Sequence, residues 1–162
     1  MDASSFCAMA TETRSVDWEL RLGFLIHDVS RLRSSVFDRC LKPLNVTRSQ
    51  WWLLAHLSRE DGMTQSQLAE ELDMGKVAVG GLIDRLEKSG LLRRDTDPSD
   101  RRINRIFLEP KSKQLIARIR KVSHRLNEQI IDGVADAKLE AAATALDAMK
   151  RSLLSYLLTT VA

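Results

Sequence analysis

The sequence predicts a mainly α-helical fold with a small β-hairpin wing, in which a winged helix-turn-helix is combined with a helical dimerisation region. Three observations support this prediction. Apolar residues recur at helical spacing towards both ends of the chain, two short helical stretches adjoin in the middle, and a turn-rich segment separates two strand-like segments. We therefore expect a flexible N-terminal tail at residues 1–15, the dimerisation region at residues 16–46 and 111–162, and the winged helix-turn-helix at residues 47–110.

The composition is that of an ordinary globular protein. The chain has 162 residues, of which 44% are hydrophobic and 29% charged, and no apolar run approaches the roughly 18 residues of a membrane-spanning helix. Residues 1–14 lack the basic start and apolar stretch of a secretory signal, and Cys7 and Cys40 have no CxxC spacing. We expect a cytoplasmic protein, and the net charge of +3 only hints at an anionic partner.

The N-terminal part is predicted to form two helices. A stripe along residues 16–41 consists of Trp18, Leu22, Leu25, Ile26, Val29, Leu32 and Val36. Pro43 ends this helix, because the residue before a proline is pushed out of helical geometry. Thr47 is then the expected N-cap of a second helix, which ends near Gly62.

Two short helices follow, at residues 64–72 and 75–89, with only Asp73 and Met74 between them. This spacing is typical of a helix-turn-helix. Their shared apolar face consists of Leu68, Leu72, Val79, Ile83 and Leu86. Gly90 suits a left-handed cap at the end of the second helix.

Residues 91–94 and 103–108 flank the turn-rich segment 95–102 and predict a β-hairpin, the only strand pair that we expect. From Arg93 to Arg105 this hairpin carries five arginines against three aspartates. A helix fits the major groove of duplex DNA while a basic hairpin reaches the minor groove or the backbone, so this order of elements indicates a DNA-binding head. The alternative is a solvated turn in which the acids and arginines pair with each other.

From residue 111 onward the pattern is helical again, with a break at Asp132 and Gly133. One apolar stripe comprises Leu115, Ile119, Val122, Leu126 and Ile130, and a second comprises Leu139, Leu146, Met149, Leu153, Leu154 and Leu157. The apolar faces of these helices and of the first helix are together longer than the DNA-binding head can bury. A second copy of the chain is the expected partner.

Several motifs carry a resemblance to a known family. They are Leu86-Glu87-x-x-Gly90-Leu91-Leu92-x-Arg94, Asp100-x-Arg102 with the apolar residues up to Leu108, Leu41-Lys42-Pro43-Leu44, and Gln67-Leu68-Ala69. Together they resemble the MarR family of winged-helix regulators. The resemblance implies an obligate homodimer whose first and last helices interlock, two heads on a pseudo-palindromic operator in double-stranded DNA, and release of the DNA by a small-molecule effector.

The resemblance also assigns roles to single residues. Arg102 matches an arginine that enters the minor groove, and Asp100 matches an aspartate that supports the wing by pairing with a neighbouring arginine. We count Arg94 as a second support of the wing. Residues 75–85 match the recognition helix, and the opening of the preceding helix suits a phosphate. The expected DNA contacts are Thr64, Gln65, Ser66, Gly75, Lys76, Val77, Ala78, Arg85, Arg101 and Arg102.

The recognition helix departs from the family pattern. Members commonly carry hydroxyl or basic side chains where this chain has Val77, Ala78, Gly80 and Gly81. Few groups can then form hydrogen bonds with base edges. We expect this protein to read thymine methyls through Val77 and Ala78 and groove shape through Arg102.

The adjacent Trp51 and Trp52 suggest a ligand site. Neighbouring residues on a helix point about 100° apart, so one can fill the core while the other lines a cavity, although packing of both is the simpler interpretation. An aromatic wall near a basic side chain suits a planar anion, and members of the family bind phenolic acids or aromatic coenzyme A thioesters. The expected ligand set is His27, Arg31, Trp51, Trp52 and His56.

The sequence as a whole predicts a homodimeric, sequence-specific transcription regulator, a repressor released by an aromatic, phenolic or acyl-CoA ligand. The alternatives are a thiol redox sensor that uses Cys40 and a winged-helix module for protein contacts. No enzyme is expected, because the chain has no nucleophile elbow, dinucleotide loop or acid pair. No cofactor is expected, and the scattered His27, His56 and His124 do not suggest a metal site.

Overall fold

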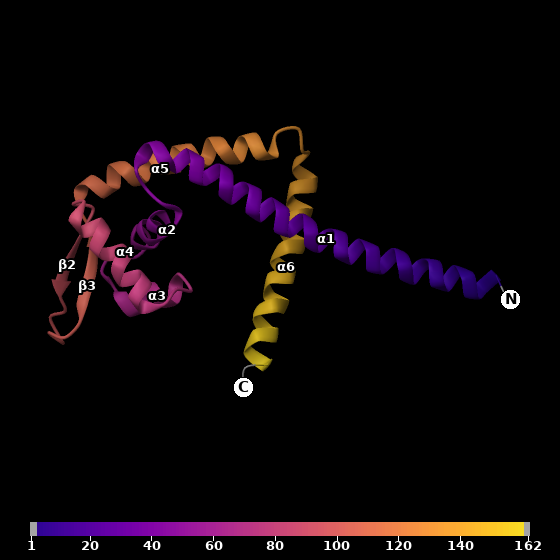
Figure 1. Cartoon of the computed structure of the whole chain (residues 1–162), viewed down its shortest axis with the longest axis horizontal. Coiled ribbons are helices and arrows are strands. Elements are labelled where there is room, and N and C mark those ends of the chain that lie inside the picture. Colours follow the sequence, from indigo (N-terminus) through magenta and orange to yellow (C-terminus); the bar gives the residue numbers. More distant parts are fainter. Residues whose placement is uncertain (1–2, 161–162) are drawn as a thin grey trace. The chain divides into compact units, whose positions relative to one another are not determined.

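The computed structural model describes the backbone of residues 3–160 and the side chains of residues 17–159 (Figure 1). The elements in chain order are α1 (Ala3–Leu41), the 3-10 turn η1 (Lys42–Leu44), α2 (Arg48–Leu57), β1 (Met63–Thr64), α3 (Gln65–Glu71), α4 (Lys76–Lys88), β2 (Leu92–Thr96), β3 (Asn104–Leu108), α5 (Pro110–Ile131) and α6 (Asp136–Thr160). The chain divides into two compact units, residues 1–122 and residues 123–162, and each is described by itself. The predicted fold class, mainly helical with a small β wing, is confirmed.

The sheet has one strand more than the sequence predicted. β2 and β3 form the expected antiparallel hairpin, and β1 adds to the other edge of β3, which gives the order β1-β3-β2. β1 pairs Met63 with Ile106 and Thr64 with Arg105. A two-residue strand has no alternating pattern to detect, so the expectation of a single strand pair was wrong.

Helix α1 is longer than predicted. It begins at Ala3, whereas the sequence predicted a flexible tail at residues 1–15 and a helix from residue 16. Several residues of this segment are good helix formers, and the chain has no glycine or proline before Gly23 to interrupt the helix. The tail contains Cys7, whose side chain lies outside the described ones.

Two capping boxes begin the helices of the head. Thr47, the predicted N-cap of α2, accepts a hydrogen bond from the Gln50 amide, and the Gln50 side chain accepts one from the Thr47 amide at 2.9 Å. Thr64 and Gln67 repeat this arrangement at the start of α3. Such reciprocal pairs satisfy amides that a helix start otherwise leaves unpaired. The sequence therefore fixes where both helices begin.

The core of the first unit joins the end of α1, the helices α2 to α4, the sheet and the first part of α5 (Figure 1). Its most deeply buried side chains are Leu41, Leu53, Leu54, Leu57, Leu68, Val79, Ile83, Leu86, Ile106 and Ile119. Each element buries one apolar face here, which holds the short α3 and α4 in place. The core thus orients the outer surfaces of α4 and of the hairpin.

Helices α1 and α6 keep long apolar faces exposed. On α1 these side chains include Trp18, Leu20, Phe24, Leu25, Val29 and Leu32, and on α6 they include Leu146, Leu153, Leu154, Tyr156, Leu157 and Leu158. Between α5 and α6 the predicted break is confirmed, because Gly133 has a φ of 74°. None of the described helices has both the length and the apolar content to cross a membrane.

Candidate DNA-binding interface

Helices α3 and α4 form the predicted helix-turn-helix. Asp73 adopts a left-handed conformation with a φ of 49°, and the Met74 amide donates to the Ala69 carbonyl oxygen at 3.0 Å. Gly75 is the N-cap of α4. The turn therefore changes the chain direction within a few residues, and it leaves the beginning of α4 on the surface.

The first turn of α4 is exposed to solvent. Lys76, Val77 and Ala78 are exposed, and 91% of Val77 is accessible to solvent. The next residue, Val79, is buried in the core. An apolar side chain as exposed as Val77 has no packing role within the described chain. The surface offered by this first turn consists of one cation, two small apolar side chains and backbone.

Gly80 has a structural role that the sequence did not reveal. Gln65 at the start of α3 donates from Nε2 to the Lys76 carbonyl oxygen at 2.9 Å. A Cβ on Gly80 would lie 2.9 Å from the same Nε2, which is closer than such atoms normally approach. The absence of a side chain at Gly80 therefore makes room for the contact that links α3 to the beginning of α4.

The start of α3 has fewer free donors than expected for a phosphate site. The capping box uses the amides of Thr64 and Gln67, and the Thr64 hydroxyl oxygen accepts from Gln67. The Gln65 side chain supports α4. Ser66 is half-buried. The predicted phosphate contact is therefore restricted to the amides of Gln65 and Ser66 and to their remaining side-chain groups.

Asp97 organises the turn of the wing. It is only 3% exposed, and its Oδ1 accepts hydrogen bonds from the Ser99 amide at 2.7 Å, the Ser99 hydroxyl at 2.5 Å and the Asp100 amide at 3.2 Å. Its Oδ2 pairs with Nε of Arg105. The hydrogen bonds from Ser99, together with Arg105, hold the pKa of Asp97 far below its usual range.

Arg105 connects this turn to the helix-turn-helix. Its Nη1 donates to the Gly62 carbonyl oxygen at 3.0 Å, directly before β1. The sequence alone identifies Arg105 only as a charge of the wing, and it does not reveal the structural roles of Asp97 and Arg105. The signal that could have found them is the Asp97-Pro98-Ser99 turn, in which an aspartate side chain commonly bonds to amides that follow it.

Asp100 and Arg102 form the outer part of the wing. Arg102 donates to Asp100 from Nε at 3.1 Å and from Nη2 at 3.0 Å, and its amide donates to Asp100 Oδ1 at 3.0 Å. The Arg102 side chain nevertheless stays 90% exposed. The arginine that pairs with Asp100 is thus Arg102 itself. The hydrogen bonds from Arg102 lower the pKa of Asp100, so both groups stay charged.

The other wing arginines differ in their surroundings. Arg94 pairs with Asp84 and Glu87 of α4, and it therefore joins β2 to the recognition helix. Arg93 pairs with Asp95 at 3.0 Å and lies over the Phe107 ring, 4.8 Å from its centre. Exposed Arg101 has no acidic partner among the side chains of residues 17–159.

Arg85 lies apart from the other expected DNA contacts. It is on the last turns of α4, eight residues after Val77, and it lines a hollow together with Lys111 and Arg118 of α5. At about 1.5 Å per residue, it is on the order of 12 Å along the helix from the exposed first turn. The structure groups Arg85 with α5 rather than with Lys76.

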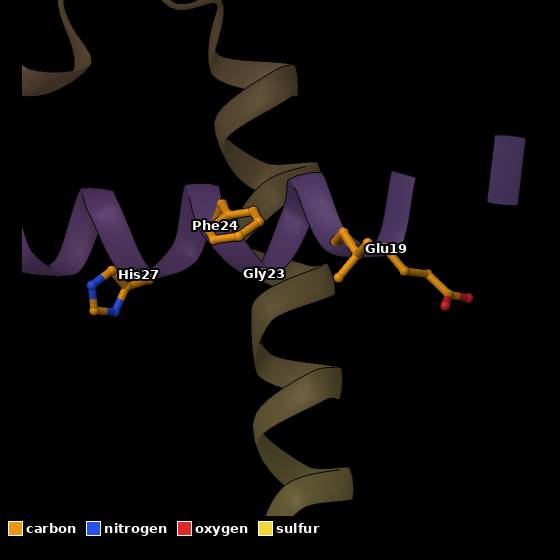
Figure 2. A pocket seen from close by; sticks show the side chains of 5 residues that line it. Glu19, Gly23, Phe24 and His27 are labelled. Carbon is orange, nitrogen blue, oxygen red and sulfur yellow. The ribbon is translucent and has the colours of Figure 1, made fainter. Parts of the chain in front are cut away.

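The structure does not bring the five expected ligand residues together. His27 and Arg31 line one open hollow along α1 with Arg48 of α2, and Arg31 pairs with Asp28 at 3.1 Å. His27 also borders an adjoining apolar hollow beside Phe24 (Figure 2).

The other three residues of the expected ligand set have separate surroundings. Trp51 is 8% exposed and belongs to the core, whereas Trp52 is 47% exposed, as the 100° rotation along a helix allows. His56 is within 3.5 Å of Glu71 of α3. Cys40, the residue of the redox alternative, is a half-buried free thiol.

Comparisons with known proteins match this architecture. Residues 44–103 match the sequence model of the MarR family. A MarR transcriptional regulator from Methanosarcina mazei Go1 is 26% identical with a TM-score of 0.73, and the match covers 83% of this chain and 96% of that one. The transcriptional repressor CouR, solved on a 23-mer DNA duplex, is 25% identical with a TM-score of 0.73, covering 80% and 92%.

A third solved structure is that of Bordetella bronchiseptica BpsR, described as regulated in its DNA binding by 6-hydroxynicotinic acid. It is 21% identical with a TM-score of 0.70, and the match covers 80% of this chain and 98% of that one. At this identity the likeness concerns the fold. The resemblance deduced from the wing motifs is confirmed: residues 44–103 match the sequence model of the MarR family, and the chain has the fold of MarR family transcription regulators.

Proposed function

We propose that this protein is a homodimeric, sequence-specific DNA-binding transcription regulator, a repressor that a small ligand releases from its operator. One observation carries the DNA-binding part: the exposed first turn of α4 and the exposed guanidinium of Arg102 belong to one head, whose parts are tied together by side-chain contacts. CouR, which is 25% identical in sequence to this chain, was solved on a DNA duplex, and this supports DNA binding by the present chain.

In this proposal α4 enters the major groove and the wing reaches the minor groove. Val77 and Ala78 contact thymine methyl groups, Lys76 meets a phosphate or a guanine edge, and Arg102 reads the width of the minor groove. Asp100 accepts hydrogen bonds from Nε and Nη2 of the Arg102 guanidinium, which stays exposed, so the side chain is already held in an extended position before it meets a narrow groove.

Replacement of thymine by uracil tests the apolar contact. We expect uracil at one or two positions of each half-site to weaken binding by about tenfold, because each contact with a methyl group is lost. The same replacements should have a smaller effect on the Val77→Ser variant, in which only the contact of Ala78 remains to be lost. Unchanged wild-type affinity with uracil at every half-site position would exclude the contact with methyl groups.

The exposed apolar faces of α1 and α6 support a homodimer. Side chains such as Phe24 and Leu158, which are 68% and 79% exposed, stay in contact with water in a single chain. Large apolar faces of this kind mark association surfaces. Sedimentation equilibrium should give twice the chain mass, and Leu153→Glu should shift it towards the monomer. A wild-type protein that stays monomeric at micromolar concentration would contradict the dimer.

The ligand part of the proposal is supported by the hollow that contains His27 and Arg31, which combines polar and apolar lining. BpsR, whose DNA binding is regulated by 6-hydroxynicotinic acid, has the same fold. Tryptophan fluorescence titration with phenolic acids and aromatic coenzyme A thioesters tests this, with Arg31→Gln as the variant and Arg21→Gln as the control. If no compound of the panel quenches the fluorescence and none releases the DNA, the ligand hypothesis is wrong.

A further inference from the structure

The turn that joins β2 to β3 carries an exposed apolar side chain (Figure 1). Ile103 is 40% exposed, and apart from Pro98 every other side chain of residues 95–105 is polar or charged. Its neighbour in the chain is Arg102, whose side chain is 90% exposed. A wing that contacted phosphates alone would need the cation but no apolar group beside it. Ile103 therefore adds a second kind of chemistry to the tip of the wing.

The backbone of Ile103 is held on both sides. Its amide donates to the Asp100 carbonyl oxygen at 3.0 Å, and its carbonyl oxygen accepts from the Asp97 amide at 2.8 Å. Asp97 is itself buried and pairs with Arg105 of β3. A β-branched side chain such as that of isoleucine also has few accessible rotamers. The turn therefore presents Ile103 as a stiff apolar group.

The pairing of Arg102 with Ile103 suits the minor groove. Proteins that bind this groove combine arginines with apolar side chains, isoleucine among them, that enter between base pairs and partly unstack them. Consecutive Cα atoms are about 3.8 Å apart, so Ile103 comes close to the groove wherever Arg102 enters it. Arg101, which is also exposed, adds a cation for the phosphates on either side.

We propose that Ile103 is a wedge, which enters the minor groove beside Arg102 and partly unstacks one base step in each half-site. This inference rests on the proposed function, because the wing must reach the minor groove. Pyrimidine–purine steps such as TA unstack easily, whereas A-tracts are stiff and have a narrow minor groove. Ile103 thus selects a flexible step, in addition to the groove width that Arg102 reads. Arg102 alone gives no reason to favour TA over AA.

The fluorescent base 2-aminopurine tests the wedge, because its emission rises when it is unstacked. It replaces each adenine in turn in the duplex that the wild type selects from a random library. In a second series, each base step of this duplex is changed to TA and to AA, and fluorescence anisotropy measures the affinity for both.

The variants separate the apolar group from the turn that carries it. Ile103→Ser removes the apolar group, and Ile103→Leu retains it. The matched control is Val134→Ser, since Val134 is also β-branched and is 42% exposed, but lies in the turn between α5 and α6. Circular dichroism checks that each variant is folded, and Ile103→Ala takes the place of Ile103→Ser if the serine variant is unfolded.

We expect the wild type to raise the fluorescence at one step of each half-site. It should bind the duplex with TA at this step about tenfold more tightly than the duplex with AA. Ile103→Ser should leave the fluorescence unchanged and should reduce the preference to less than about twofold, because no apolar group remains to enter the step. Ile103→Leu and Val134→Ser should retain both the fluorescence change and the preference.

The proposal is overturned if the wild type raises the fluorescence at no step, or if Ile103→Ser keeps the preference for TA. It is also overturned if Ile103→Ser weakens binding to the TA and AA duplexes by the same factor, because Ile103 then only supports the turn or contacts the sugars. In these cases the wild type still binds its selected duplex, so the proposed function stands. A wild type that selects no duplex contradicts the proposed function, and the wedge fails with it.

Discussion

Arg105 of β3 donates a hydrogen bond from Nη1 to the carbonyl oxygen of Gly62 at 3.0 Å, although 43 residues separate them in the chain. The same guanidinium pairs with buried Asp97 in the turn of the wing. Gly62 lies directly before β1, which ends at Thr64, the N-cap of α3. A single side chain therefore links the base of the wing to the start of the helix-turn-helix, so that both DNA-contacting parts keep one relative orientation.

Replacing Arg105 should uncouple the wing from the helices. We expect Arg105→Gln to weaken DNA binding by about tenfold, because the buried carboxylate of Asp97 loses its cation and the turn becomes less ordered. Arg93→Gln is the matched control, since it removes an arginine from the neighbouring strand whose acidic partners, Asp95 and Glu109, are far less buried than Asp97. The measurement is fluorescence anisotropy with a duplex at fixed salt. Equal losses in both variants would mean that only charge matters.

Asp97 should make stability depend on pH. Its pKa is lowered in the folded chain, so the unfolded chain binds the proton more readily. The stabilisation by the carboxylate is then complete above about pH 5, and it is lost as the pH falls through the unfolded pKa of about 3.9 towards the lower folded value. Urea denaturation of wild type and Asp97→Asn should show a difference in unfolding free energy that narrows below about pH 4. A constant difference from pH 7 to pH 3 would contradict this role.

The two glycines of α4 should respond differently to alanine. A Cβ on Gly80 meets Gln65 Nε2 at 2.9 Å, whereas a Cβ on Gly81 has its nearest neighbour, Arg85 Nη1, at 3.8 Å. Gly81→Ala should stabilise the protein by up to about 1 kcal/mol, the difference in helix propensity. Gly80→Ala should stabilise the protein less than Gly81→Ala does. It should also weaken DNA binding, because Gln65 loses its hydrogen bond to the Lys76 carbonyl oxygen. Thermal unfolding measures the stability of the two variants, and fluorescence anisotropy measures their DNA affinity. Identical behaviour of the two variants would refute the role of Gly80.

A second pair of glycines tests the join between β1 and the wing. Gly62 has a φ of 84°, and a Cβ there would lie 2.8 Å from the Phe107 ring, whereas Gly90 has a φ of 70° and open space around it. Gly62→Ala should destabilise the protein by about 2–3 kcal/mol, and Gly90→Ala by about 1 kcal/mol, since only the first adds a clash to the conformational cost. Urea denaturation of both gives the comparison. A larger loss for Gly90→Ala would contradict the close contact.

Much of the fold could be predicted from the sequence because its signals are local. Thr47 and Gly90 mark helix ends through side-chain and backbone chemistry that needs no distant partner. β1 and the Asp97–Arg105–Gly62 contacts could not be predicted, since they depend on which segments the core brings together. The same applies to the ligand set, because a tryptophan pair indicates one buried and one exposed ring without saying what else lies nearby.

The central claim, that this head holds duplex DNA through both α4 and the wing, is tested most directly by the salt dependence of binding. A duplex is first selected from a random library with the wild type, and its affinity for wild type and Arg102→Gln is measured across salt concentrations. We expect the logarithm of affinity to fall steeply and linearly with the logarithm of salt, and Arg102→Gln to lower the slope by about one and the affinity by at least about tenfold. An affinity that does not change with salt, or an Arg102→Gln variant that binds like the wild type, would contradict the claim.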